Sequence, residues 1–470
     1  MHSMDLHTLT IKEAKSKLKN KEISSLELTQ AYLERIEKID PKLNSFVTVT
    51  KDKALQMAKD ADEALSAGED KPLLGLPFSI KDNFCTKDIR TTASSKVLDD
   101  FIPPYSATVV SRLMDAGIVH LGKTNMDAWA HGSSTATSDY GPTRNPWDVE
   151  RYPGGSSGGA AASVASDEAL AAIGSETAGS VRGPASWCGL VGLKPTYGRV
   201  SRYGVIAMAS STDSPGPLTK TVEDAATILE VLAGKDPHDA TSSSLPVEKY
   251  SETMKAGKKM TIGIADDYFD GVDSEVVAKV QEALKLLESK GHTVKKIELF
   301  DPKYAIDVYT ILMRSEVSSN LARFDGIRYG NDRSYFAEEA KRRMMLGTYA
   351  LSSGYYDAYY KKAQKVRTLI VEDFAKAFAE VDVIIGPTLP TPAIKIGQAD
   401  DPMFGEKADI LTEPSAIAGL CAINMPVGFS SLGLPIGMQI MGRQFGESTI
   451  LDLAYQYEKE TEFWKQKPNL

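Results

Sequence analysis

Residues 75–83, GLPFSIKDN, and residues 106–122, SATVVSRLMDAGIVHLG, decide the fold class of this 470-residue chain. Each holds a short apolar run, LPFSI in the first and IVHLG in the second, and each run adjoins a glycine. The residues before the second run have the apolar spacing of a helix. Short apolar runs that alternate with helices are typical of the buried strands of α/β proteins. The sequence therefore predicts a mixed or mostly parallel sheet that is covered by helices.

The same alternation continues outward to both ends of the chain. Thr10 with Glu13, and Ser24 with Glu27, have the spacing of capping boxes ahead of amphipathic stretches, so helices are expected over residues 10–67. Further strands are predicted at 260–265, 293–299, 381–387, 422–429 and 435–442, and further helices at 221–234, 274–291 and roughly 303–381. Residues 130–220, rich in Gly, Ser, Thr and Pro, are expected to be loops packed between core elements.

We interpret this pattern as one α/β domain that spans residues 1–470. Its predicted parts are a helical entry segment at 1–70, a core at 71–235, and a C-terminal part with helical decoration at 236–470. No internal repeat or low-complexity tract divides the chain.

Composition narrows the class of protein. The net charge is -9 and the pI is near 5.4, which argues against a chain that grips a phosphate backbone by itself. The three cysteines are scattered, so neither a disulfide framework nor a zinc site is indicated, and no ligand cluster for another metal is evident. No apolar run has the length of a signal peptide or of a membrane span, so we expect a cytoplasmic protein with no membrane contact.

Two loops of small residues carry candidate chemistry. RYPGGSSGGAAASVAS (151–166) places four glycines around Ser156 just before an Ala-rich helix, which fits a phosphate site, a structural helix cap or a catalytic serine. GSETAGSVRGPASWCGLVGLKPTYGR (174–199) places Ser180 after small residues whose N–H groups could face a developing oxyanion. A tight packed turn is the alternative for this second loop.

A serine nucleophile needs a base. Of the six histidines, only His131, in AWAHGSSTATS, lies in a loop suited to a site. A buried lysine can also serve, because desolvation lowers its pKa. Lys81 ends an apolar run and would project from the carboxyl end of a strand, where open α/β sheets place ligands. An ordinary exposed lysine at a strand end is the alternative.

Together these segments resemble the amidase signature family, in which a lysine, a serine in a cis peptide and a second serine form the catalytic triad. The matching stretches are GLPFSIKDN, GGSSGG (154–159) and GSETAGSVRGPAS (174–186). The resemblance implies a single domain with a mixed sheet covered by helices. It also implies that Ser180 attacks, that Ser156 relays the proton and that neutral Lys81 accepts it. The oxyanion would be held by backbone amides, among them those of Thr177, Ala178 and Gly179.

Within that family the chain resembles, nearly end to end, the A subunits of bacterial aminoacyl-tRNA amidotransferases. Further matching stretches lie at 141–159, 192–205, 316–330, 346–370 and 433–443. The resemblance implies a subunit that hydrolyses glutamine and sends ammonia to a B subunit, while a small C subunit joins the two. The B subunit would use ATP and magnesium to convert Glu-tRNA(Gln) to Gln-tRNA(Gln), and the sequence leaves open whether Asp-tRNA(Asn) is also a substrate. The tRNA would be held mainly by the partner.

Glutamine carries charges that a closed pocket must match, an α-carboxylate that requires an Arg and an α-ammonium that requires an acid. By position in the resembling stretches these roles fall on Arg343 and Asp409, with Tyr309 as a neighbour. Arg342 is an alternative to Arg343, and the helix that carries both could equally be a solvated face. His131 stands beside the pocket, where the resembling subunits often carry Met; a loop histidine hydrogen-bonded to backbone is the alternative.

The chain departs from the family pattern in the loop of Ser180. Where Asp-Thr-Gly-Gly-Ser is common it has Glu176, Thr177, Ala178, Gly179 and Ser180, and Gly183 stands where Gln is common. An alanine is costly only where φ must be positive, so we predict that residue 178 has an ordinary φ. Two other functions stay open: a stand-alone amidase of small or aryl amides, and a non-catalytic scaffold, which the complete triad disfavours.

Overall fold

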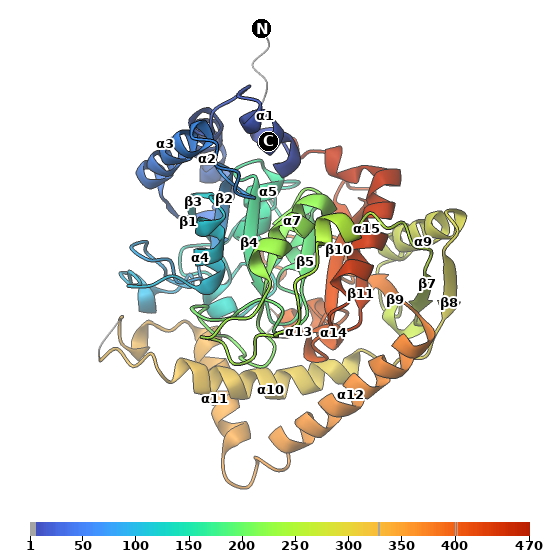
Figure 1. The fold of residues 1–470 in the computed structure, drawn as a ribbon. Coiled ribbons are helices and arrows are strands. Elements are labelled where there is room, and N and C mark those ends of the chain that lie inside the picture. The colour runs from blue at the N-terminus through green and yellow to red at the C-terminus, as the bar shows by residue number, and fades with distance from the viewer. Residues whose placement is uncertain (1–5, 328–329, 400, 402) are drawn as a thin grey trace.

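The computed structural model describes residues 6–327, 330–399, 401 and 403–470 (Figure 1). Within them eleven strands join in one mixed sheet, and helices cover the sheet, which confirms the predicted fold class. The strands are β1 (Phe46–Val49), β2 (Pro77–Lys81), β3 (Val119–Thr124), β4 (Ala171–Glu176), β5 (Val191–Lys194), β6 (Ser214–Thr219), β7 (Thr261–Ile264), β8 (Thr293–Lys296), β9 (Val383–Pro387), β10 (Cys421–Phe429) and β11 (Pro435–Gly442).

The α-helices of the described residues are α1 (Ile11–Lys19), α2 (Ser25–Leu43), α3 (Lys51–Ser66), α4 (Thr108–Asp115), α5 (Gly158–Ala165), α6 (Arg182–Cys188), α7 (Val222–Leu232), α8 (Tyr250–Thr253), α9 (Ser274–Ser289), α10 (Lys303–Leu321), α11 (Glu338–Leu351), α12 (Tyr360–Glu380), α13 (Phe404–Ala408), α14 (Glu413–Ile417) and α15 (Glu447–Thr461). Helices α1 to α3 lie at one end of the molecule, and α10 to α12 extend along the opposite end (Figure 1).

The N-terminal helices begin where the capping boxes predict. The hydroxyl of Thr10 accepts a hydrogen bond from the backbone N–H of Glu13, and the Glu13 carboxylate accepts one from the N–H of Thr10. Ser24 and Glu27 repeat this arrangement at the start of α2. The helical prediction for this segment is wrong at β1, which pairs antiparallel with β3. Three of its four residues are β-branched, and the edge of the sheet offers them a partner that helical periodicity does not reveal.

The strand order is β1-β3-β2-β4-β6-β5-β10-β11-β9-β7-β8. Strand β2 pairs in parallel with both β3 and β4, whereas β10 pairs antiparallel with both β5 and β11. Because β2 and β4 are parallel neighbours, their carboxyl ends lie at the same edge of the sheet. The segments that follow Lys81 and Glu176 therefore start side by side.

The glycine-rich region is more regular than predicted. Residues 130–220 contain β4, β5 and β6 of the central sheet together with α5 and α6, and every residue from 152 to 188 is buried. Small side chains let these backbones pack closely, so the composition reflects tight packing rather than loop structure.

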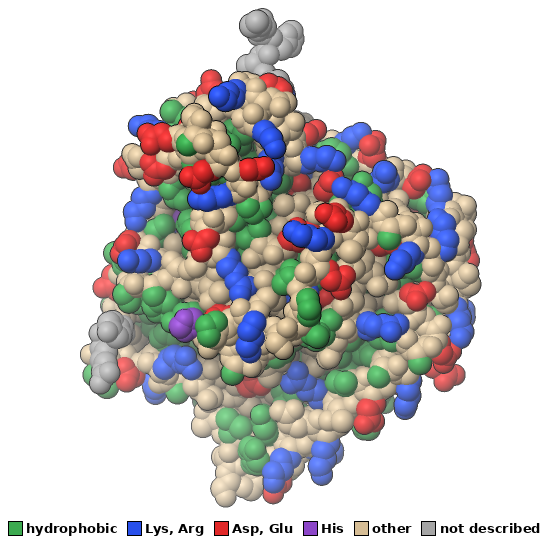
Figure 2. Space-filling view, viewed as in Figure 1, with side chains coloured by type: hydrophobic (Ala, Val, Ile, Leu, Met, Phe, Trp, Pro, Cys, Tyr) green, Lys and Arg blue, Asp and Glu red, His purple; other side chains and the backbone are tan. Residues whose placement is uncertain are grey.

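The predicted helical stretch at 303–381 consists of α10, α11 and α12, and α10 packs against the other two. Helix α10 carries Tyr309 and α11 carries Arg343, so this layer supplies side chains to the region where β2 and β4 end. Lys and Arg are interspersed with Asp and Glu over the face shown in Figure 2. None of the helices in the described ranges combines the length and the apolar character needed to cross a membrane.

Candidate active site

Lys81, the last residue of β2, is completely buried among hydroxyl groups. Its Nζ lies 2.8 Å from Oγ of Ser156, 2.8 Å from Oγ of Ser157 and 3.0 Å from the carbonyl oxygen of Ser175. Burial lowers the pKa of Lys81 from 10.5 to about 7, even though nearby carboxylates, Asp127 foremost, oppose the change. A large fraction of Lys81 is therefore neutral near pH 7, and the alternative of an exposed lysine at the strand end is wrong.

The backbone before Ser156 has room only for glycine. The Gly155–Ser156 peptide bond is cis, as the family resemblance implies. A Cβ on Gly155 would lie 2.1 Å from Oδ2 of Asp127 and 2.4 Å from the backbone nitrogen of Ser134. Asp127 in turn accepts hydrogen bonds from the N–H groups of Ser134 and Thr135, so the loop is clamped between two segments of the chain.

The start of α5 does not offer its amides to an anion. The N–H of Gly158 donates to Oγ1 of Thr135 at 3.1 Å, and the N–H of Gly159 donates to the carbonyl oxygen of Asn125 at 3.1 Å. Because a phosphate site at a helix N-terminus needs free N–H groups, the phosphate-binding alternative for this loop finds no support.

Glu176 fixes both ends of the loop that carries Ser180. Its carboxylate accepts hydrogen bonds of 3.0 Å from the N–H groups of Val181 and Arg182 and forms a buried ion pair with the Arg182 guanidinium. The glutamate that replaces the family's usual aspartate is thus fully engaged in holding the loop closed.

The loop itself exposes backbone donors. The N–H groups of residues 177–180, which include the predicted donors Thr177, Ala178 and Gly179, find no acceptor among the residues that the structure describes. Ala178 is not among the residues with positive φ, as predicted. A Cβ on Gly179 would lie 2.4 Å from Oδ1 of Asp409 and 2.4 Å from Oγ1 of Thr412, so this position requires glycine. Unpaired amides beside a serine hydroxyl are the donors that an oxyanion hole needs.

A small cavity of about 10 Å³, here called the inner pocket, lies at Ser180. It is lined by Ala130, Gly132, Ser133, Ser180, Met208, Tyr309, Arg343, Gly405 and Asp409. Three of the side chains expected to contact glutamine, Tyr309, Arg343 and Asp409, are thus brought to the serine, and all three are buried. Arg342, the alternative to Arg343, does not line the inner pocket.

Two of these side chains are held by neighbours. Asp409 accepts a hydrogen bond of 2.7 Å from the hydroxyl of Ser133, and Nε of Arg343 donates one of 2.5 Å to Oε1 of Glu339. Nη1 of Arg343 also donates to Sδ of Met313 at 3.2 Å, a weak acceptor that a substrate carboxylate can replace.

His131 lies behind this wall rather than in it. Its ring is buried, and neither nitrogen has a hydrogen-bond partner among the described residues, so the alternative of a backbone-bonded histidine is not found. Burial, reinforced by the charge of Arg343, holds the pKa of His131 well below its usual value. The imidazole is therefore neutral and can both donate and accept one hydrogen bond.

A family model described as Amidase matches residues 27–451. This chain belongs to the amidase family. The resemblance drawn from the three matching segments is thereby confirmed, and the fold class agrees with it.

This amidase is 50% identical to the A subunit of the glutamyl-tRNA(Gln) amidotransferase of Desulfatibacillum aliphaticivorans, over 99% of this chain and 100% of that protein. It is 52% identical to the subunit of the same name from Thermoanaerobacter pseudethanolicus, over 98% of each chain. The crystal structure of that subunit from Thermotoga maritima superposes with a TM-score of 0.82 at 39% identity, over 98% of this chain and 96% of the other. A peptide amidase from Stenotrophomonas maltophilia superposes with a TM-score of 0.85 at 29% identity, over 98% of each.

Several residues of this site were not predicted. Ser157 lies as close to Lys81 as Ser156 does, and the paired serines of GGSSGG were the available signal. Ser133, which donates to Asp409, lies two residues from His131 in a loop already singled out. Met208 forms part of the pocket wall, and nothing in its sequence context indicates this.

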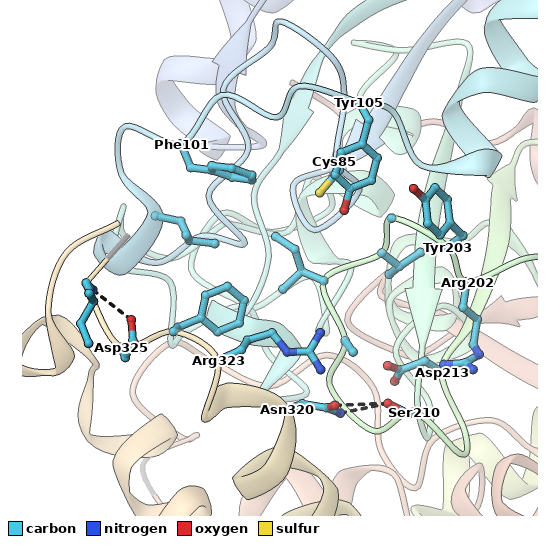
Figure 3. A pocket seen from close by; sticks show the side chains of 17 residues that line it. Cys85, Phe101, Tyr105, Arg202, Tyr203, Ser210, Asp213, Asn320, Arg323 and Asp325 are labelled. Atoms are coloured by element: carbon cyan, nitrogen blue, oxygen red, sulfur yellow. Dashed lines mark hydrogen bonds between the residues drawn. The ribbon is translucent and has the colours of Figure 1, made fainter. Parts of the chain in front are cut away.

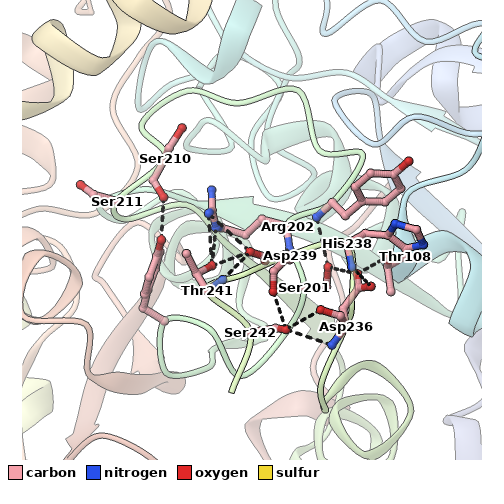
Figure 4. A network of polar contacts seen from close by, with 12 residues as sticks. Thr108, Ser201, Arg202, Ser210, Ser211, Asp236, His238, Asp239, Thr241 and Ser242 are labelled. Carbon is pink, nitrogen blue, oxygen red and sulfur yellow. Dashed lines mark hydrogen bonds and ion pairs between the residues drawn. The ribbon is translucent and has the colours of Figure 1, made fainter. Parts of the chain in front are cut away.

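Met208 lies in the loop of residues 201–213, which precedes β6, and a polar network anchors the start of this loop (Figure 4). Asp236 accepts hydrogen bonds from the hydroxyls of Thr108 and Ser201, and Oδ2 of Asp239 accepts one from the N–H of Arg202 at 2.9 Å. The segment after α7 is therefore fastened to this loop.

The end of the same loop is fastened to the oxyanion segment. Asp213 accepts a hydrogen bond of 2.7 Å from the hydroxyl of Thr177 and others from the N–H groups of Met208 and Ala209. Burial raises the pKa of Asp213 to about 6, and its carboxylate adds to the charges that favour protonated Lys81. Asp213 is thus hydrogen-bonded both to the Met208 segment and to Thr177, and its charge acts on Lys81, the candidate base.

Proposed function

We propose that this amidase is the glutamine-hydrolysing subunit of a tRNA-dependent amidotransferase that converts Glu-tRNA(Gln) to Gln-tRNA(Gln). The observation that carries the proposal is the inner pocket, in which Ser180 shares one small space with Arg343 and Asp409. An arginine and an aspartate can pair with the two charges of a free amino acid. Near-complete relatives of the chain, at about 50% identity, carry the name of that subunit.

The proposed chemistry begins with neutral Lys81. It accepts the proton of the Ser156 hydroxyl while Ser156 accepts the proton of Ser180, and Oγ of Ser180 attacks the side-chain amide carbon of glutamine. The amides of residues 177–180 stabilise the resulting oxyanion. The proton returns through Ser156 to the leaving nitrogen, ammonia departs, and an acyl-enzyme ester remains. Water activated by the same relay then cleaves the ester to glutamate and restores Ser180.

Ser157 supports this relay without being its nucleophile. Its hydroxyl lies 3.2 Å from the carbonyl oxygen of Ser175, and its N–H donates to the carbonyl oxygen of Ser180 at 3.2 Å. These contacts tie the two serine loops together and help to hold Lys81 in register with Ser156.

The partner assignments rest on the relatives and on the chain's own composition. We place a B subunit, which binds ATP, magnesium and aminoacyl-tRNA, and a C subunit beside this chain in a cytoplasmic complex. The net charge of -9 supports an arrangement in which the partner holds the tRNA.

A stand-alone amidase is the second candidate, and the likeness to a peptide amidase favours it. The two are separated by assaying glutamine and simple amides with the chain alone and after co-expression with candidate B and C subunits, with Ser180→Ala as control. Glutamine hydrolysis that rises with the partners and vanishes in the variant is expected. High partner-independent turnover of simple amides would establish the second candidate instead.

A further inference from the structure

A second, larger cavity adjoins the inner pocket and is here called the vestibule. Its volume is about 840 Å³, against about 10 Å³ for the inner pocket. The two cavities share four lining residues, Gly132, Ser133, Arg343 and Gly405. A space of about 10 Å³ holds a single water at most, so a substrate must displace part of its wall to reach Ser180.

A further cavity of about 920 Å³ is lined by the side chains drawn in Figure 3. None of its described lining residues lines the inner pocket. Between the two stands the loop of Met208 and Asp213, whose start is fastened by Asp236 and Asp239 and whose end is fastened to Thr177. This partition is built from buried hydrogen bonds and is therefore costly to open.

The wall toward the vestibule is built differently. Two of its four residues are glycines, and an added Cβ on Gly405 would meet Oγ of Ser133 at 3.5 Å and Nη2 of Arg343 at 3.9 Å, which are ordinary contacts. The remaining barrier consists of the Ser133 hydroxyl and the long Arg343 side chain. Opening this wall breaks the hydrogen bonds of these two side chains to Asp409 and Glu339 but leaves the backbone in place, whereas the other partition requires a loop to move.

The charges of the vestibule indicate the class of its occupant. Its lining includes three cationic and three anionic side chains, which are Lys341, Arg342, Arg343, Glu338, Glu339 and Asp401. This balance suits a small zwitterion and offers no net attraction to a polyanion such as tRNA.

We propose that the vestibule is the entry site of the amino-acid substrate, through which a free zwitterionic amino acid passes between Arg343 and Gly405 to Ser180. This inference rests on the proposed function, because it takes the substrate of Ser180 to be a free amino acid. His131, which also lines the vestibule, has two buried ring nitrogens without a hydrogen-bond partner among the described residues, and it can supply a hydrogen bond to the ammonium or carboxylate as the substrate passes the wall.

The test is to obstruct each large cavity in the assembled complex. Ala136 lines the vestibule and Ala207 lines the other cavity, and both are partly buried alanines, so Ala136→Cys and Ala207→Cys form a matched pair. The three native cysteines of this chain are buried, and the untreated and treated wild-type complexes measure any background reaction. Separate samples of each variant are modified with methyl or with benzyl methanethiosulfonate, and glutamine hydrolysis is measured before modification, after it and again after reduction.

We expect the benzyl group on Ala136→Cys to lower kcat/KM by about tenfold or more, the methyl group to lower it by less than about threefold, and reduction to restore it. Either group on Ala207→Cys is expected to change kcat/KM by less than about twofold. A loss confined to Ala207→Cys, an equal loss at both positions, or no loss at Ala136→Cys would each overturn the inference. If the unmodified complex hydrolyses another amide in place of glutamine, the proposed function fails, and the same size dependence on that amide still decides the entry route.

Discussion

The pH dependence of glutamine hydrolysis is expected to report the protonation of Lys81. Burial lowers the pKa of this lysine to about 7. Only the neutral amine can accept the proton that Ser156 relays, so activity is gained as pH rises through the pKa and is lost below it. The rising limb of kcat/KM is therefore expected near pH 7, well below the ordinary range of a lysine.

The size of the effect follows from a single titration. With a pKa of about 7, roughly a tenth of Lys81 is neutral at pH 6 and roughly nine tenths at pH 8, so kcat/KM rises about tenfold and then levels. A lysine with its ordinary pKa would give a rise of about a hundredfold over the same interval and no plateau below about pH 10. The two profiles differ in both slope and plateau.

The assay is ammonia release by the assembled complex between about pH 5.5 and 9, after confirming that the complex stays intact across this range. Lys194→Met is the control, because Lys194 is also a buried lysine with a lowered pKa, but its Nζ donates to the backbone carbonyls of Pro195 and Leu420 and to no serine of the site within the described chain. It is expected to leave the limb in place. Lys81→Arg, whose guanidinium stays charged, is expected to lose about a thousandfold or more in kcat. A profile that keeps rising to pH 9, or a limb that moves in Lys194→Met, would refute the assignment of Lys81 as the base.

Three further outcomes are expected. Lys81 should add about 2 kcal/mol to the free energy of unfolding of the wild type between pH 7 and 9, because the native Lys81, with a pKa of about 7, loses a proton that the unfolded chain keeps. Lys81→Met lacks this gain, so it should lose about 2 kcal/mol relative to the wild type over the same interval. Urea midpoints of both proteins at pH 7 and pH 9 measure the difference. Glu339→Gln should raise KM for glutamine about five- to thirtyfold with kcat nearly unchanged, because Glu339 positions Arg343. Glu338→Gln is the control, since the Glu338 side chain is 96% exposed, and it should alter neither constant. Equal effects of the two variants would contradict the role of Glu339 in positioning Arg343. Gly179→Ala should lower kcat/KM about fivefold or more, because the added Cβ meets Asp409. Ala178→Gly should change kcat/KM by less than about threefold, since residue 178 has no positive φ. A large gain in Ala178→Gly would show that the backbone at residue 178 is strained.

Much of the fold could be predicted because its signals are local. The capping boxes at Thr10 and Ser24 lie within one helical turn, and the apolar run before Lys81 marks β2 without reference to any other segment. Strand β1 was missed because four residues between two helices carry too little periodicity, and only the edge of β3 makes them a strand. The strands within residues 130–220 were missed for a related reason. Their small residues are needed because segments distant in the sequence pack closely against them, and this packing cannot be read from the local sequence.

Some residues of the site could also be predicted from local sequence, whereas others are defined only by contacts between distant segments. Lys81, Ser156 and Ser180 stand in short segments whose residue types suit nucleophilic catalysis. The parallel pairing of β2 with β4 brings the segments of Lys81 and Ser180 together, and the hydrogen bond between Lys81 and Ser156 joins the third segment to them. Ser133 and Met208 could not be found, because their roles exist only where separate loops meet at the inner pocket. The need for glycine at residue 179 likewise arises from Asp409, which approaches across nearly half of the chain's length.

The partners of each buried lysine, rather than burial itself, mark Lys81 as the base. Lys123 is equally buried, and although Oγ1 of Thr91 lies 2.8 Å from its Nζ, Oδ1 of Asp82 lies 3.7 Å away and favours the charged amine. Lys194 donates to the carbonyl oxygen of Leu420 at 2.7 Å, and Lys220 pairs with the Asp167 carboxylate. The pKa of each of these three lysines is lowered only to about 8. Carboxylate and carbonyl oxygens accept hydrogen bonds but cannot donate them, so they stabilise only the N–H groups of the amine. The hydroxyls beside Lys81 can do both, and they keep its nitrogen hydrogen-bonded whether it is charged or neutral. A proton can therefore move between Lys81 and Ser156 without leaving a buried group unpaired, whereas the carboxylates beside Lys123 and Lys220 and the carbonyl oxygens beside Lys194 favour the charged amine.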